Sequence, residues 1–91
     1  MNDPFLVTGA AGFIGAALVQ QLIKNGERVV GVDNLNDYYD PKLKKARLRQ
    51  IETNATDRSW LFHHLSIQDS DSIESLFAKE KPKVVIHLAA Q

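Results

Sequence analysis

Residues 6–15 read Leu6-Val7-Thr8-Gly9-Ala10-Ala11-Gly12-Phe13-Ile14-Gly15, an apolar run that passes through three glycines into a helical pattern. This order predicts a strand, a tight turn and the start of a helix. Gly9 ends the strand where the chain must reverse, and glycine reaches the φ > 0 conformations that such a turn can require. Gly12 has no Cβ, so an anion could approach the amide groups at the positive end of the helix. Gly15 lies on the same helix face and permits close packing of the helix against the strand.

A second apolar segment, residues 28–33, ends in Asp33. An acidic residue about 20 positions after such glycines, at the end of the next strand, accepts hydrogen bonds from ribose hydroxyls in dinucleotide sites. A glycine-rich turn by itself also occurs without any ligand. Because the turn occurs together with Asp33, we favour a dinucleotide-binding site over a turn without a ligand.

Composition bounds the class of protein. The 91 residues suffice for one small domain, and 44% hydrophobic residues, 24% charged residues and a formal net charge of zero are typical of a globular protein. This charge balance argues against nucleic acid as a partner. The absence of cysteine excludes disulfides and thiolate metal sites. No basic leader and no apolar run of about 20 residues is present, so we expect a cytoplasmic protein with no membrane partner.

The remaining sequence predicts strands that alternate with helices. Strands are expected over residues 5–8, 28–33, 60–65 and 84–89, and helices over residues 12–24, 41–52 and 70–79, the last capped by Asp69 or Ser70. This alternation predicts an α/β fold, the N-terminal half of a Rossmann-type doubly wound parallel sheet with strand order 3-2-1-4. Its ligand crevice is expected beyond the carboxyl ends of the first and fourth strands, where the strand order reverses.

The second expected helix has Asp40 as its N-cap and Pro41 in its first helical position. Its inward face is expected to carry Leu43, Ala46 and Ile51. The same helix carries five cations, which are Lys42, Lys44, Lys45, Arg47 and Arg49. A solvated helix surface is the favoured interpretation of these cations. The alternative is that some of them reach an anionic ligand near the preceding loop.

Three segments carry a resemblance to a known family: residues 8–15, Val32-Asp33-Asn34-Leu35-Asn36 and His87-Leu88-Ala89-Ala90. They resemble the extended short-chain dehydrogenase/reductases that act on nucleotide sugars, the NAD-dependent epimerase/dehydratase family. The spacing of three between successive glycines separates that family from the classical dehydrogenases. Within the family, residues 33–41 together with Leu43-Lys44 and Ala46-Arg47-Leu48 are most similar to UDP-glucuronate 4-epimerases. The resemblance runs the full length of the 91 residues.

The resemblance implies NAD as the cofactor and assigns it a set of binding residues. These are Gly9, Gly12, Phe13, Ile14, Gly15, Asp33, Asn34, Asn36, Ser66, Ile67, Leu88, Ala89 and Ala90. The glycine turn would hold the pyrophosphate, while Asp33 would bind the adenosine ribose and repel the extra phosphate of NADP. Ile67 would flank the adenine, and residues 88–90 would pass beneath the nicotinamide half. Relatives usually place an acid where this chain has Ser66, whose neutral hydroxyl forms a weaker hydrogen bond.

Catalysis in this family uses a Tyr and a Lys four positions later, in sequence that continues beyond residue 91. Tyr38 and Lys42 have this spacing, but Asp40-Pro41 between them predicts a turn and a helix start at the adenosine end of the site. We therefore expect no catalytic residue in residues 1–91. The histidines His63, His64 and His87 lack metal-ligand spacing, so no metal site is expected, and His87 is expected to be satisfied within the sheet.

We therefore expect residues 1–91 to be a partial NAD-binding Rossmann domain that is inactive alone. The parent would be a homodimeric epimerase or dehydratase that acts on a UDP-sugar by hydride transfer through a 4-keto sugar. Two alternatives stay open: a non-catalytic dinucleotide sensor of the same fold, and a fragment that binds nothing by itself. The unpaired edge of the last strand, residues 84–88, predicts self-association of the chain.

Overall fold

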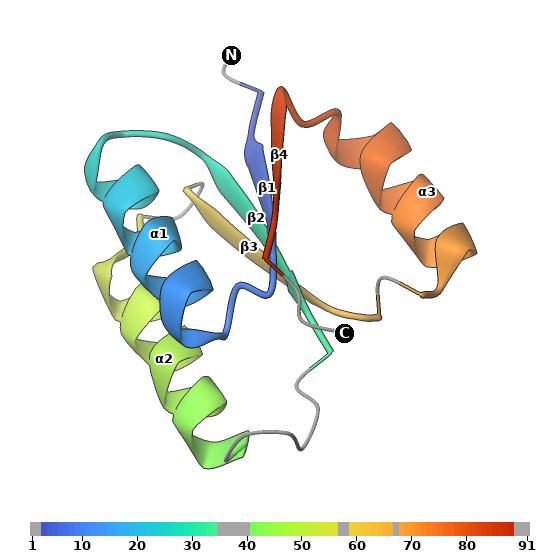
Figure 1. Ribbon diagram of the computed structural model, residues 1–91. Helices are drawn as coiled ribbons and strands as arrows, with labels where there is room; N and C mark the ends of the chain where they lie inside the picture. Colours follow the sequence, from blue (N-terminus) through green and yellow to red (C-terminus); the bar gives the residue numbers. More distant parts are fainter. Residues whose placement is uncertain (1–2, 35–40, 57–58, 67, 89–91) are drawn as a thin grey trace.

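The computed structural model of the chain describes residues 3–34, 41–56, 59–66 and 68–88. In these residues, strands alternate with helices (Figure 1). The elements are β1 (Phe5–Thr8), α1 (Phe13–Lys24), β2 (Val29–Asp33), α2 (Pro41–Asn54), β3 (Trp60–His64), α3 (Ser70–Glu80) and β4 (Val84–His87). The sheet has the order β3-β2-β1-β4, and its pairings are all parallel. The expected fold class and strand order are confirmed.

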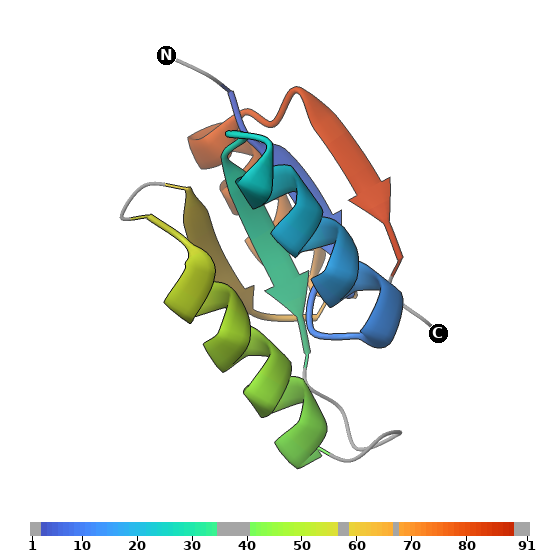
Figure 2. The same cartoon turned by 90° about the vertical axis from the view of Figure 1, so that its left-hand side faces the viewer.

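The helices form two layers, with the sheet between them. α1 and α2 cover one face of the sheet and α3 covers the other (Figures 1 and 2). Neighbouring residues of a strand point to opposite faces, so Val7 packs with α1 and α2 while Leu6 packs with Leu76 of α3. All five residues of β2 are buried, as expected for a parallel strand covered on both sides.

The inward face of α2 differs from the expected one. Leu43 is 49% exposed and Ala46 is also exposed, so the expectation that they face inward is wrong. Ile51 is fully buried as expected, and the positions that share its face are Leu48 and Lys44. Leu48 lies three residues before Ile51, and Lys44 lies four residues before Leu48, so the three positions follow the helical repeat. The inward face of α2 therefore includes Lys44 in place of the expected Leu43 and Ala46.

Several elements end one or two residues away from their expected ends. β2 begins at Val29, β3 ends at His64, β4 ends at His87 and α3 ends at Glu80. α2 continues to Asn54, into the expected polar connection. The Asn54 amide donates to the Gln20 side chain of α1 at 3.2 Å, which gives this last turn a tertiary contact that local sequence does not reveal.

Asp69 caps α3. Its carboxylate oxygens accept hydrogen bonds from the Ser72 backbone N–H at 3.2 Å and from the Ser72 hydroxyl at 2.8 Å. The side-chain bond first, and the backbone bond second, lower the pKa of Asp69 below its ordinary value. Of the two caps considered from the sequence, Asp69 is the one observed.

Trp60 of β3 lies against Gly31 of β2. A Cβ at Gly31 would overlap the Trp60 ring, so only glycine leaves room for the indole. The ring stacks near Phe62 with centroids 6.1 Å apart and packs on the cluster beneath α1 and α2. Its Nε1 is buried and has no hydrogen-bond partner within the described ranges.

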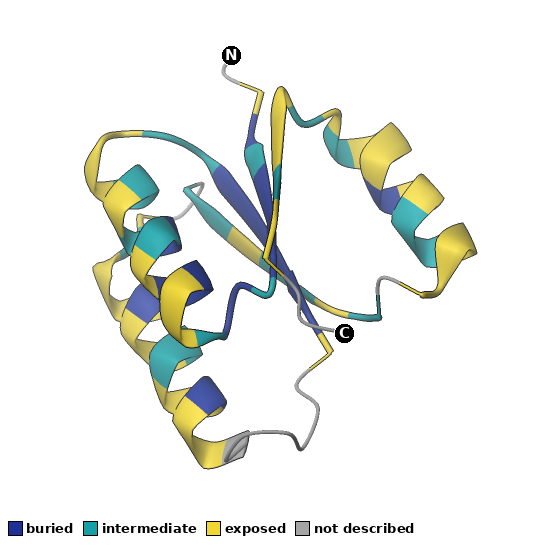
Figure 3. Ribbon diagram, viewed as in Figure 1, coloured by how far each residue is buried: buried dark blue, intermediate teal, exposed yellow. Residues whose placement is uncertain are grey.

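β4 is the most exposed strand of the sheet (Figure 3). Among the described strands it pairs with β1 alone, and Val84 and Val85 are 40% and 45% exposed. One apolar edge of the sheet is therefore open to solvent. Within the described part of the chain, no helix is long and apolar enough to cross a membrane.

Candidate functional site

The glycine-rich turn after β1 is hydrogen-bonded to the carboxyl end of β2. The backbone N–H groups of Gly9 and Ala10 both donate to the Val32 carbonyl, at 2.8 and 3.2 Å. Gly9 has φ 72°, which confirms the positive φ expected where the chain reverses. These bonds place the start of α1 beside the carboxyl end of β2.

Gly12 and Gly15, the two later glycines of the turn, do not have a positive φ; what matters at both positions is the absence of a Cβ. A Cβ at Gly15 would overlap the carbonyl oxygen of Gly9, which confirms the expected close approach of helix and turn. A Cβ at Gly12 would lie 3.2 Å from the same oxygen, tighter than ordinary contact. Gly12 is also the N-cap of α1, and no side chain caps that helix end. The first amide groups of a helix lack intrahelical acceptors, so this end of α1 offers donors to an anion.

Phe13 and Ile14 begin α1 with their side chains in solvent, 77% and 67% exposed. Neither side chain belongs to the core, although both are apolar. The Arg47 guanidinium of α2 lies over the Phe13 ring, 5.7 Å from its centroid, within the range of a cation–π interaction. The open end of α1 is thus bordered by α2.

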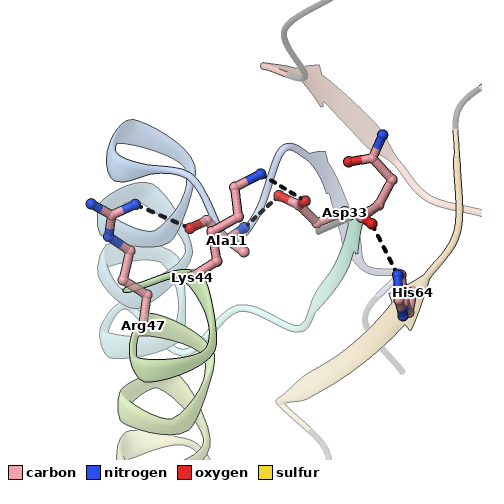
Figure 4. Close-up of polar contacts among 6 residues, drawn as sticks. Ala11, Asp33, Lys44, Arg47 and His64 are labelled. Atoms are coloured by element: carbon pink, nitrogen blue, oxygen red, sulfur yellow. Dashed lines mark hydrogen bonds and ion pairs between the residues drawn. The ribbon is translucent and has the colours of Figure 1, made fainter. Parts of the chain in front are cut away.

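Asp33 is buried at the end of β2, only 5% exposed. One carboxylate oxygen, Oδ2, accepts the Ala11 backbone N–H at 3.0 Å, and the other, Oδ1, accepts Lys44 Nζ at 3.2 Å (Figure 4). The acid and the glycine-rich turn, 22 residues apart in sequence, are therefore in direct contact. This is the juxtaposition that the sequence predicts.

Lys44 and Arg47 are members of the site that sequence reasoning missed. Lys44 is 7% exposed and pairs with Asp33, and Arg47 Nη1 donates to the Ala11 carbonyl at 3.3 Å (Figure 4). The favoured interpretation of the α2 cations as a solvated surface is wrong for Lys44. Lys45 and Arg49 do lie on the exposed face. The signal that reveals Lys44 is its helical spacing from Leu48 and Ile51.

The carboxyl end of β4 is joined to that of β1. The buried Thr8 hydroxyl is 2.8 Å from His87 Nδ1, and the Leu88 backbone N–H donates to the Thr8 hydroxyl at 3.0 Å and to its carbonyl at 3.2 Å. The expectation that His87 is satisfied within the sheet is confirmed. Leu88 therefore lies beside the turn that begins at Gly9, where the strand order reverses.

The carboxyl end of β3 meets that of β2. The Leu65 backbone N–H donates to the Asp33 carbonyl at 3.2 Å, and His64 Nε2 lies 2.9 Å from the carbonyl oxygen of Asn34, an exposed residue (Figure 4). The Ser66 hydroxyl accepts the Gln68 backbone N–H at 3.1 Å. The remaining expected site residues lie outside the described residues; they are Asn36, Ile67, Ala89 and Ala90.

The described residues fit a dinucleotide. The end of α1 has donors without a side-chain cap, Gly12 leaves a space that a Cβ would narrow, and Asp33 faces the same turn. These groups can bind and orient a diphosphate and a ribose. No cluster of three His, Asp or Glu residues suited to a metal occurs in the part of the chain that the structure describes.

The sequence matches a known family over nearly its whole length. The model of the GDP-mannose 4,6 dehydratase family matches residues 6–91. UDP-glucuronate 4-epimerase 4 of Arabidopsis thaliana is 45% identical over 87 residues, covering 94% of this chain and 19% of the plant protein. The chain spans about a quarter or less of the length of the curated relatives it matches.

Solved structures give the same result for the fold. UDP-glucose 4-epimerase of Thermotoga maritima, solved with UDP-glucose, superimposes with a TM-score of 0.71 at 41% identity, covering 100% of this chain and 25% of that one. UDP-glucose 4-epimerase of Stenotrophomonas maltophila, solved with bound NAD and formylated UDP-arabinopyranose, gives 0.79 at 28% identity, with coverage of 99% and 25%. The sheet and helices of this chain thus match the N-terminal Rossmann-type region of such enzymes.

Proposed function

Because the chain belongs to the GDP-mannose 4,6 dehydratase family, whose relatives include nucleotide-sugar epimerases and dehydratases, we propose that residues 1–91 form the NAD-binding part of such an enzyme. The observation that carries this proposal is the hydrogen bond from the Ala11 N–H to Asp33. It holds the anion-binding turn and the ribose-binding acid together in one site. The NAD bound to a relative of the same fold supports the proposal.

Within this site the residues have distinct proposed roles. The uncapped amide groups at Phe13 and Ile14 bind the pyrophosphate, and Gly9, Gly12 and Gly15 let it approach the backbone. A carboxylate accepts about four hydrogen bonds, so Asp33 can bind ribose hydroxyls together with its protein donors. The other proposed contacts are those of Asn34, Asn36, Ser66, Ile67, Leu88, Ala89 and Ala90. NAD, when bound, supplies the acceptor and donor of a hydride.

We propose a UDP-hexuronic acid, UDP-glucuronate, as the substrate of a protein that continues as the relatives do. The support is the 45% identity over 87 residues with a UDP-glucuronate 4-epimerase. The resemblance of residues 33–41, 43–44 and 46–48 to that subgroup adds to it. The reaction would invert C4 of the sugar by hydride transfer through a 4-keto sugar. The residues proposed here hold the cofactor, and those that contact the sugar lie in the further sequence.

Calorimetric titration with NAD tests the binding function on the 91-residue chain. We expect the wild-type chain to bind NAD and Gly12→Val to weaken binding by about tenfold or more, which is about 1.4 kcal/mol, because its side chain fills the space beside Gly9. Ala17→Val introduces the same side chain at an exposed position of α1 and should leave NAD binding unchanged. A wild-type chain that folds but releases no heat with either NAD or NADH would contradict the proposal.

The substrate is tested on a protein of the relatives' length that contains this chain. We expect it to convert UDP-glucuronate into its 4-epimer, detected by chromatography of the sugar nucleotides. Unchanged UDP-glucuronate together with dehydration of another sugar nucleotide would reject the epimerase assignment. Binding of NAD with no conversion of any sugar nucleotide would instead favour a dinucleotide sensor.

A further inference from the structure

The ion pair between Asp33 and Lys44 is almost sealed from solvent. The Nζ and Oδ1 atoms are 3.2 Å apart, and the two side chains are 3% and 8% exposed. Charges buried to this extent are paired, because an unpaired one would bear the full cost of leaving water. Dissolved salt screens such a pair far less than it screens surface charges. The cation is thus a fixed part of the site that surrounds Asp33.

This pairing changes what a ligand meets at the end of β2. A carboxylate alone would repel a phosphate, but the fields of opposite charges 3.2 Å apart largely cancel at longer distances. Arg47 adds a second cation through its hydrogen bond to the Ala11 carbonyl. The expectation that the negative charge of Asp33 repels NADP therefore does not take the positive charge of Lys44 into account.

We propose that Lys44 is a specificity-determining residue for the cofactor, which compensates the charge of Asp33 and becomes a ligand for a 2′-phosphate once that charge is removed. The inference rests on the proposed function, since it assumes that a dinucleotide binds at this turn. In the wild-type chain, NAD is preferred through the hydrogen bonds that Asp33 accepts from ribose hydroxyls. A 2′-phosphate has no such hydrogen to give in its place.

The conservative substitution Asp33→Asn separates these effects. The amide oxygen can still accept the Ala11 N–H, so the turn keeps its support. The carboxylate that neutralises Lys44 is gone, and the ammonium group needs another anion. A phosphate is such a partner, because hydrogen bonds between charged groups are roughly twice as strong as neutral ones.

The experiment measures the dissociation constants of NAD and NADP by calorimetry on the 91-residue chain, for the wild type and three variants. The variants are Asp33→Asn alone, Asp33→Asn with Lys44→Met, and Asp33→Asn with Lys45→Met. The last is the matched control, since Lys45 is the exposed neighbour on the same helix and its loss changes the net charge equally. Circular dichroism checks the fold, and Asp33→Ser replaces Asp33→Asn in the series if the amide destabilises it.

We expect Asp33→Asn to lower the ratio of the NADP to the NAD dissociation constant by about tenfold or more. Adding Lys44→Met should abolish this gain, whereas adding Lys45→Met should preserve it. If NAD binds the wild type but the Lys44 and Lys45 variants show equal ratios, the inference is overturned and the proposed function stands. If the wild type binds neither dinucleotide, the proposed function is overturned and this inference with it.

Discussion

Gly15 is the residue at which the structure leaves least room for change. A Cβ there would overlap the Gly9 carbonyl oxygen, which belongs to the backbone and cannot rotate away. We expect Gly15→Ala to lower the free energy of unfolding by about 1–3 kcal/mol, the usual cost of overpacking. Urea denaturation followed by circular dichroism measures the loss.

The control for Gly15→Ala lies two residues along the same helix. Ala17 is exposed, so Ala17→Val should change the unfolding free energy by less than about 1 kcal/mol through helix propensity alone. Equal stability of Gly15→Ala and the wild type would mean that α1 can move away from the turn. The close approach of helix and turn would then not be what fixes this glycine.

Single residues also show where sequence reasoning stopped. Asp33 and the glycines could be named because each has a motif spacing with a physical cause. Lys44 was harder to identify, because a lysine in a polar helix is ordinarily solvated. Its spacing from Leu48 and Ile51 indicates an inward position but does not identify its partner, Asp33, which is 11 residues away. The contact of Thr8 with His87 spans 79 residues and has no local signal. Pairings of this kind follow from the topology of the sheet.

α2 is the element whose orientation the sequence predicted least well. Ile51 is fully buried against the sheet and α1, whereas Leu43 is 49% exposed. We expect Ile51→Ala to lower the free energy of unfolding by about 2–5 kcal/mol, because it removes buried methyl groups and leaves a cavity. Leu43→Ala should cost less than about 1 kcal/mol.

Chemical denaturation of both α2 variants gives the comparison directly. A larger loss for Leu43→Ala than for Ile51→Ala would restore the inward face expected from the sequence. The apolar positions of α2 are few, and Leu43, Ala46 and Ile51 are spread over a wider arc of the helix than Lys44, Leu48 and Ile51 are. In α1, by contrast, Val19 is buried, and Leu22 and Ile23 pack against the same cluster.

The whole sheet was predictable because the alternation of strands and helices admits few topologies. Right-handed crossovers place β1 at the centre, and the glycine turn then marks the point where the strand order reverses. The ends of elements were less predictable, since tertiary contacts such as that between Asn54 and Gln20 extend them. The location of the site followed from the topology, whereas its charge balance depends on which face of α2 lies against the sheet.

The open edge of β4 is the feature of the whole molecule with the clearest experimental consequence. We expect the 91-residue chain to self-associate through this strand, which leaves Val84 and Val85 exposed. Sedimentation velocity should show a mean sedimentation coefficient that rises with concentration. Val85→Lys should reduce the rise, since a charge on an edge strand opposes pairing with another strand.

Leu61→Lys places the same charge on β3, at the opposite edge of the sheet, where Leu61 is 41% exposed. Association that persists in this variant but weakens in Val85→Lys assigns the contact to β4. A wild-type chain that sediments as a monomer at high concentration would contradict self-association at either edge.

The indole that fills the space above Gly31 gives the chain an optical reporter of its own. Trp60 is the single tryptophan of the sequence, so its fluorescence arises from the junction of β2 and β3 and from nowhere else. Separation of these two strands would expose the ring to water and shift its emission to longer wavelength. Emission and helical ellipticity recorded in the same denaturation would thus reveal whether the outer strand detaches before the helices melt.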